Sequence, residues 1–111
     1  MIVEERNYSL KVGGVAEFMR IYEAEGLDLQ RRILGRMVGY FTTDFGRLHQ
    51  IVHLWAYRDL AERDQRRAQL AQEPEWRAFQ QKTGPLIVEQ TNRLLLPASF
   101  SPWFSDEGDQ G

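Results

Sequence analysis

Cysteine is absent from the 111-residue sequence, which excludes a disulfide framework, a thiolate metal site and a cysteine nucleophile. Long apolar runs are absent too, because no stretch approaches the roughly 18–20 residues that a membrane span needs. The 14 basic residues do not outnumber the 16 acidic ones, so the electrostatic footprint of a nucleic-acid-binding protein is missing. The first residues are charged, whereas a secretory signal peptide would have an apolar segment there. We therefore expect a cytoplasmic protein whose mature form starts at or near Met1.

Catalytic and metal-binding motifs are scarce. No serine stands in a Gly-x-Ser-x-Gly frame, and Gly13-Gly14 lacks the later glycines and lysine of a phosphate-binding loop. The two histidines, His49 and His53, lie four residues apart in a predicted strand, which separates them by roughly 13 Å and excludes a shared metal ion. We predict no metal site and no cofactor, although haem ligation by a single histidine stays open.

What is present suffices for one globular domain. Hydrophobic residues make up 42% of the chain and charged residues 27%, which is ordinary globular usage. Residues 105–111 contain three acidic side chains and no basic one, so the chain without them would carry 14 minus 13, or +1. We therefore predict a folded domain over residues 1–103 and an acidic flexible tail over residues 104–111.

The period of the hydrophobic pattern changes repeatedly along the chain. Strand formers dominate four segments, residues 2–10, 37–43, 49–57 and 86–96. Helical spacing dominates the two segments between them, residues 15–33 and 59–83. The order β-α-β-β-α-β is the ferredoxin-like plan. It predicts an α+β fold with a four-stranded antiparallel sheet and the helices on one face.

Individual residues predict where these segments begin, bend and end. Gly26 should break the first helical segment, and Gly35 should end it. Gly46 can take the positive φ that a hairpin turn over residues 44–47 requires. Asp59 should cap the next helix, and Pro74 should open a further helical piece.

In a sheet with one exposed face, apolar and polar residues alternate along each strand. Residues 51–57 lack this alternation, because nearly all of them are apolar. Helices cover only one face, so a second copy of the chain is the simplest cover for the other and predicts a homodimer. The alternative is a monomer whose tail folds back to place Phe100, Trp103 and Phe104 on the open face.

Residues of equal parity in a strand share a face, so His49, Ile51, His53, Trp55 and Tyr57 line up together. We predict a ligand site on this wall, formed by Arg6, Tyr8, Tyr40, His53, Trp55 and Tyr57. In it, His53 would act as a catalytic acid or base and Arg6 would hold an anionic oxygen. The alternative is that these side chains are ordinary core.

Arginines in the two helical segments are interleaved with acidic residues. They are Arg31, Arg32, Arg36, Arg63, Arg66 and Arg67. Mixed charge of this kind on helices is typical of a solvated surface with weak ion pairs, and we predict that role for all six.

Residues 34–57 closely resemble the core of NIPSNAP-domain proteins, with Gly39-Tyr40 and His53-Leu54-Trp55 in fixed register. Further matches lie in residues 5–13, 74–79 and 92–97, so the likeness covers about residues 2–103. Val12 departs from the family's usual proline. The resemblance implies a dimeric α/β barrel, in which two ferredoxin-like sheets face each other, and no established reaction.

Distant relatives with this barrel include cofactor-free monooxygenases, haem-degrading enzymes and lactone isomerases, although a shared fold is a weak indication of shared chemistry. Three functions therefore stay open. The chain binds a small apolar or aromatic ligand against the sheet, or it is a cofactor-independent monooxygenase or isomerase using the same site, or it is a protein-interaction module. Relatives in higher organisms are tied to mitochondria, but this chain lacks the Arg- and Ser-rich leader at its start, so we do not transfer that location.

Overall fold

The four predicted strands form one antiparallel sheet in the computed structural model, which describes residues 1–102. β1 (Ile2–Leu10) lies between β3 (Gln50–Tyr57) and β4 (Ile87–Leu95), and β2 (Arg36–Thr42) pairs with the outer side of β3. The resulting order, β2-β3-β1-β4, is that of the predicted ferredoxin-like fold.

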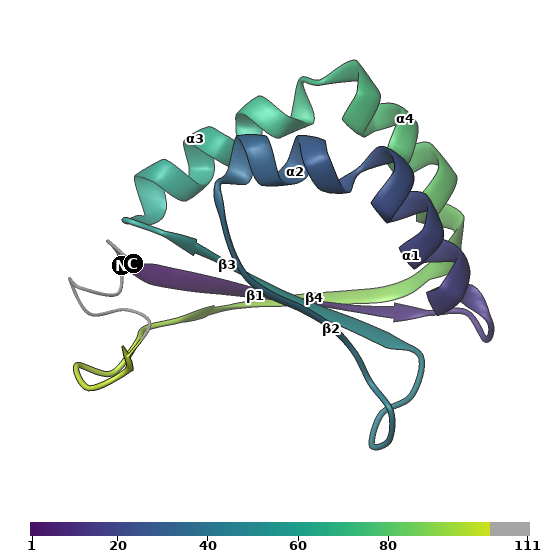
Figure 1. Ribbon diagram of the computed structural model, residues 1–111, viewed down its shortest axis with the longest axis horizontal. Coiled ribbons are helices and arrows are strands. Elements are labelled where there is room, and N and C mark those ends of the chain that lie inside the picture. Colours follow the sequence, from purple (N-terminus) through teal and green to yellow (C-terminus); the bar gives the residue numbers. More distant parts are fainter. Residues whose placement is uncertain (103–111) are drawn as a thin grey trace.

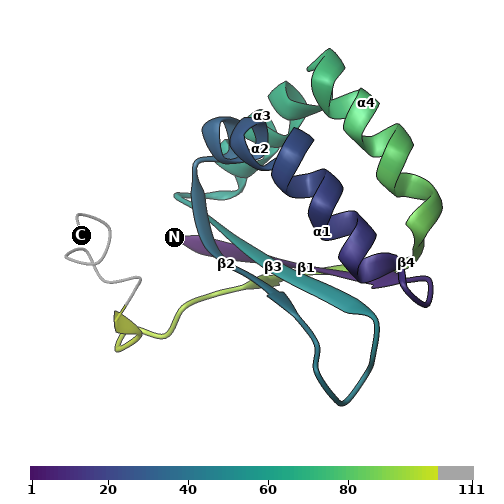
Figure 2. The same cartoon turned by 45° about the vertical axis from the view of Figure 1, so that its right-hand side comes forward.

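The helices all lie on one face of this sheet, as predicted (Figure 1). They are α1 (Gly14–Glu25), α2 (Leu27–Leu34), α3 (Leu60–Ala71) and α4 (Pro74–Thr83), followed by a 3₁₀ turn over Gly84–Leu86. Seen from a second side, α1 runs alongside α4, and α2 lies beside α3 (Figure 2). Within residues 1–102, no helix is long and apolar enough to cross a membrane.

The predicted boundaries are largely confirmed. Gly26 separates α1 from α2, and Gly46 takes a φ of 88° in the β2–β3 hairpin. The Asp59 carboxylate caps α3 by accepting a hydrogen bond of 2.8 Å from the Glu62 backbone N–H. His49 is an exception, because it precedes β3 with a φ of 60° and is exposed, so it does not share the buried face of that strand.

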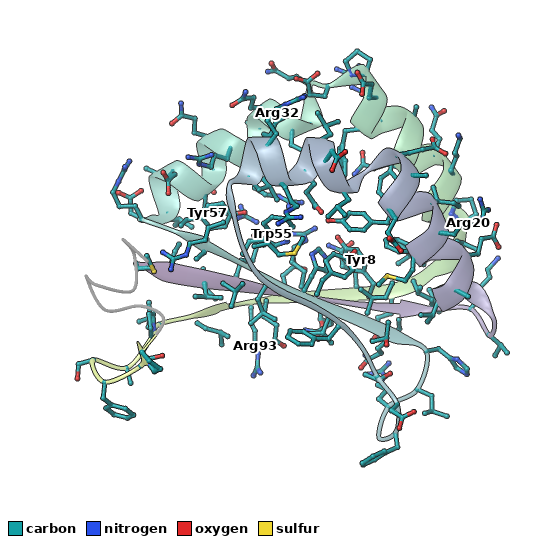
Figure 3. All side chains as sticks on the ribbon, in the orientation of Figure 1. Tyr8, Arg20, Arg32, Trp55, Tyr57 and Arg93 are labelled. Carbon is teal, nitrogen blue, oxygen red and sulfur yellow. The ribbon has the colours of Figure 1, made fainter. Side chains whose placement is uncertain are left out.

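The covered side of the sheet, called the helix face here, contains the hydrophobic core. It receives alternate side chains of β1 and β3, and Trp55 and Tyr57 are buried there against residues of all four helices. Figure 3 shows Tyr8, Trp55 and Tyr57 on this side and Arg93 on the opposite side.

The other side of the sheet, called the open face here, carries Phe41, Val52, Leu54 and the ion pair between Glu5 and Arg93. Phe41 is 55% exposed, and its ring lies across Gly39 on the same strand. A Cβ at Gly39 would lie 2.5 Å from that ring, so only glycine permits this placement.

The residues that could cover the open face from within the chain do not do so where the structure describes them. Phe100 is 88% exposed. Trp103, Phe104 and the predicted tail over residues 104–111 lie outside the described residues.

Candidate functional site

Strand register brings the predicted site residues into a row across the helix face. Arg6 of β1 pairs directly with His53 of β3, and His53 pairs in turn with Tyr40 of β2. Tyr8, two residues after Arg6, lies on the same face and contacts the His53 ring edge-on, with 4.9 Å between ring centroids. The alternation of side chains in three neighbouring strands is thus sufficient to gather this group.

A cavity of about 80 Å³ lies above this row, between the sheet and the helices. Four of the predicted residues line it: Arg6, Tyr8, Tyr40 and His53. The helices and β4 add Tyr22, Gln30, Arg67, Phe79, Thr83 and Gln90. Trp55 and Tyr57, which were also predicted to bind the ligand, do not line this cavity and are fully buried in the core beside it.

An aromatic stack forms one wall of the cavity. Tyr22 stacks on Tyr40, and Tyr40 stacks on His53, with 4.6 Å between ring centroids in both pairs. The Tyr22 hydroxyl is anchored because it donates a buried hydrogen bond of 2.6 Å to the Gln30 side chain. Burial raises the pKa of both tyrosines, so their hydroxyls stay protonated at physiological pH. The stack therefore fixes the orientation of the His53 imidazole against uncharged aromatic rings.

The protonation of His53 follows from its contact with Trp55. The Trp55 indole N–H donates to Nδ1 of His53 at 2.8 Å, and an indole nitrogen can only donate. Nδ1 is therefore the unprotonated acceptor, and the neutral ring carries its hydrogen on Nε2. Burial, followed by the charges of Arg6 and Arg67, lowers the pKa of His53 to about 3. His53 is thus a neutral hydrogen-bond donor at physiological pH.

Two donors at this site lack a partner. Nε2 of His53 and NH1 of Arg67 are both buried, and neither has a hydrogen-bond acceptor within the described residues. The Tyr57 hydroxyl lies close to the Arg67 guanidinium, which opposes the rise that burial causes in the tyrosine pKa, but no hydrogen bond of ordinary geometry joins the two groups. Most buried polar groups in proteins are hydrogen-bonded, and leaving one unpaired costs about 1–3 kcal/mol.

The positive charge at the cavity is only partly compensated. The Glu4 carboxylate accepts from Arg6 at 3.0 Å and from Arg63 at 2.8 Å, and these contacts outweigh burial and lower its pKa. Arg67 forms no salt bridge with any carboxylate in residues 1–102. The Glu4 carboxylate therefore accepts from Arg6 and Arg63 and acts on Arg67 only through its charge, without a salt bridge.

Arg67 lines the cavity, although its charged surroundings in the sequence predict a solvated residue. Arg31 and Arg32 are exposed, as predicted, whereas Arg63 reaches Glu4 in the sheet and Arg67 lines the cavity. The usable signal was the position of Leu70, the single buried residue of α3. Residues three, four and seven positions before it lie on the same side of the helix, and two of these are Arg63 and Arg67.

This arrangement can donate hydrogen bonds but offers little to accept a proton. None of the side chains that line the cavity is a carboxylate, and the guanidinium groups stay protonated. Within the described residues, no group of three His, Asp or Glu side chains could hold a metal ion. The site therefore suits an occupant that supplies hydrogen-bond acceptors.

Comparison with known proteins agrees with the resemblance seen in the sequence. The NIPSNAP family model matches residues 3–102. Protein NipSnap homolog 2 from Homo sapiens is 35% identical over 101 residues, which cover 91% of this chain and 35% of that protein. The chain thus spans about a third of the length of the curated relatives it matches.

Solved structures give the same result. A NIPSNAP-like domain protein from Burkholderia xenovorans is 52% identical, with a TM-score of 0.89 over 91% of this chain and 88% of that chain. A NIPSNAP family protein from Agrobacterium tumefaciens is 44% identical, with a TM-score of 0.89 over 91% and 96%. A putative antibiotic biosynthesis monooxygenase from Nitrosomonas europaea shares the fold alone, at 10% identity and a TM-score of 0.65 over 87% and 98%. The chain belongs to the NIPSNAP family.

Proposed function

We propose that the chain binds a small, partly apolar molecule in the cavity between the sheet and the helices. The observation that carries this proposal is the meeting of an aromatic wall with buried, unpaired donors at one cavity. Ligand sites typically combine an apolar lining with a few polar groups that fix orientation. Ordinary core packing would leave no reason to bury donors without partners.

The size of the cavity limits how the ligand sits. Ligand sites usually measure about 300–1,000 Å³, so a cavity of about 80 Å³ holds only one end of a molecule. Gln80 of α4 and Gln90 of β4 line the cavity and are exposed, so the opening lies between these two elements. The rest of the ligand would extend past them toward solvent.

Binding is favoured over the catalytic alternative by the state of His53. A cofactor-independent monooxygenase or isomerase that ionises its substrate needs a base near the reacting carbon. Nδ1 of His53 is already occupied by Trp55, and a pKa of about 3 makes the ring a weak base. Catalysis by His53 stays a prediction, and turnover of a bound ligand would establish it.

The cavity proposal is tested by closing the opening. Wild-type protein is screened by thermal shift against small aromatic and fatty molecules, which should raise the melting temperature because they bind the native state. Gln80→Trp should abolish the shift by blocking the opening. Gln81→Trp is the matched control, since Gln81 is exposed on the same helix and does not line the cavity. No shift with any compound, or an equal loss in both variants, would refute the proposal.

We further propose that two copies of the chain pair through their open faces. Supporting this are the exposed ring of Phe41 and the half-buried Val52 and Leu54 beside it. Exposed apolar side chains grouped on one side of a sheet are typical of an interface, and two-fold dimers are the commonest oligomers. We expect this dimer to act in the cytoplasm. A role as a protein-interaction module would instead show as a partner bound to a monomer.

A further inference from the structure

The two unpaired groups at the cavity both require a hydrogen-bond acceptor. Nε2 of His53 carries a hydrogen because Nδ1 accepts from Trp55, and NH1 of Arg67 belongs to a guanidinium that has no acceptor atom. Both groups can only donate. An occupant that satisfies them must therefore present at least two acceptor lone pairs on one small group.

The positive charge of the cavity arginines favours an anionic ligand. Arg6 shares the Glu4 carboxylate with Arg63, and Arg67 has no carboxylate partner among residues 1–102. Burial is the main cause that lowers the pKa of Arg67 and of His53, and the positive charge of Arg6 lowers both further. A neutral ligand would leave Arg67 with only the charge of Glu4, which forms no salt bridge with it, whereas an anion would add a direct charge partner.

The volume and the lining of the cavity indicate which kind of anion fits. A cavity of about 80 Å³ has the room of roughly two or three water molecules, which suits a planar carboxylate better than a bulky anionic group. Part of the remaining lining is apolar, since the rings of Phe18, Tyr22, Trp76 and Phe79 face the same space from α1 and α4. A carboxylate attached to an aromatic or aliphatic body fits both parts.

We infer that the cavity binds the carboxylate of a small aromatic or aliphatic acid, with Arg67 and His53 donating hydrogen bonds to its oxygens. This inference rests on the proposed function and specifies the ligand class of that site. Arg67 is then the residue that determines specificity, because a guanidinium prefers a carboxylate over a neutral amide of the same shape. Arg6 positions the site from the sheet, where its guanidinium is already engaged by Glu4.

The test compares an acid with its neutral isostere. Binding of phenylacetate and of phenylacetamide is measured by calorimetry on wild-type protein, and we expect at least tenfold tighter binding of the acid. Arg67→Gln should weaken binding of the acid far more than binding of the amide and so remove this preference. Arg20→Gln is the matched control for loss of one positive charge, because Arg20 projects from the outer side of α1 (Figure 3).

A second variant keeps the test decisive if Arg67→Gln fails to fold. His53→Gln retains both an acceptor for Trp55 and a donor, so it should bind the acid more tightly than His53→Phe, which retains neither. Equal affinities for acid and amide, both abolished by Gln80→Trp, would overturn the carboxylate inference and leave the proposed cavity intact. Failure of both ligands, together with failure of every compound in the thermal-shift screen, would overturn both.

Discussion

The two faces of the sheet are built from the same strands and differ in almost every property. On the helix face, alternate residues such as Arg6 and His53 are buried with polar atoms that the fold leaves partly unsatisfied. On the open face, apolar side chains such as Phe41, which is over half exposed, lie beside polar residues and the ion pair between Glu5 and Arg93. Period-two alternation here separates a face with buried polar groups from a face with exposed apolar side chains.

The open face gives the largest expected effect, because the association that we propose should be lost completely. Phe41→Asp places a charge at the centre of the proposed contact and should halve the molar mass in light scattering, from twice the 13.0 kDa chain mass to that mass. Phe45→Asp is the matched control, since Phe45 is 86% exposed in the hairpin turn beyond the sheet. A wild-type protein of 13.0 kDa at micromolar concentration would contradict the association.

On the helix face, we expect a smaller effect, in which the buried His53 makes the free energy of unfolding depend on pH. The pKa of His53 is about 3 in the folded chain and near its ordinary 6.5 when unfolded. As pH falls from 6.5 toward 3, the unfolded chain therefore takes up the proton first, and stability is lost by up to about 1.4 kcal/mol per pH unit. Above pH 6.5 the imidazole is neutral in both states and contributes nothing.

This slope is best measured between pH 6.5 and 5, because the lowered pKa of Glu4 keeps that carboxylate ionised there. Urea unfolding of His53→Gln should show a flatter pH profile than wild type. His49→Asn is the control, since His49 is exposed and asparagine tolerates its positive φ. A wild-type slope that persists in His53→Gln would contradict the buried, neutral state assigned to this ring.

Much of the fold could be predicted from the sequence, because its signals are local. Gly26, Gly46 and Asp59 mark boundaries through backbone and capping preferences that need no tertiary context. The row of Arg6, His53 and Tyr40 was also predictable in part, since parity fixes the face of each residue. The direct pairing between these residues depends on strand register, which hairpin and crossover geometry decide.

The positions of Arg67, Trp55 and Tyr57 relative to the cavity depend on tertiary packing, which a local sequence pattern does not predict. Arg67 was assigned to solvent because acidic and basic residues are interleaved in α3, and the one apolar residue buried there, Leu70, marks the sheet-facing side only weakly. Trp55 and Tyr57 share a strand face with His53 but do not line the cavity, because the core packs closely around them. His49 left the predicted group because the turn backbone rotates it out of the strand.

The central claim is that His53 presents a neutral Nε2–H to the ligand at the cavity. The most direct measurement is a ¹H–¹⁵N spectrum of the imidazole nitrogens at pH 7, recorded before and after addition of phenylacetate. We predict one protonated nitrogen, Nε2, in the free protein, with a signal that moves when the acid binds. An imidazolium at pH 7, or a ring that does not respond while phenylacetate binds, would contradict the account.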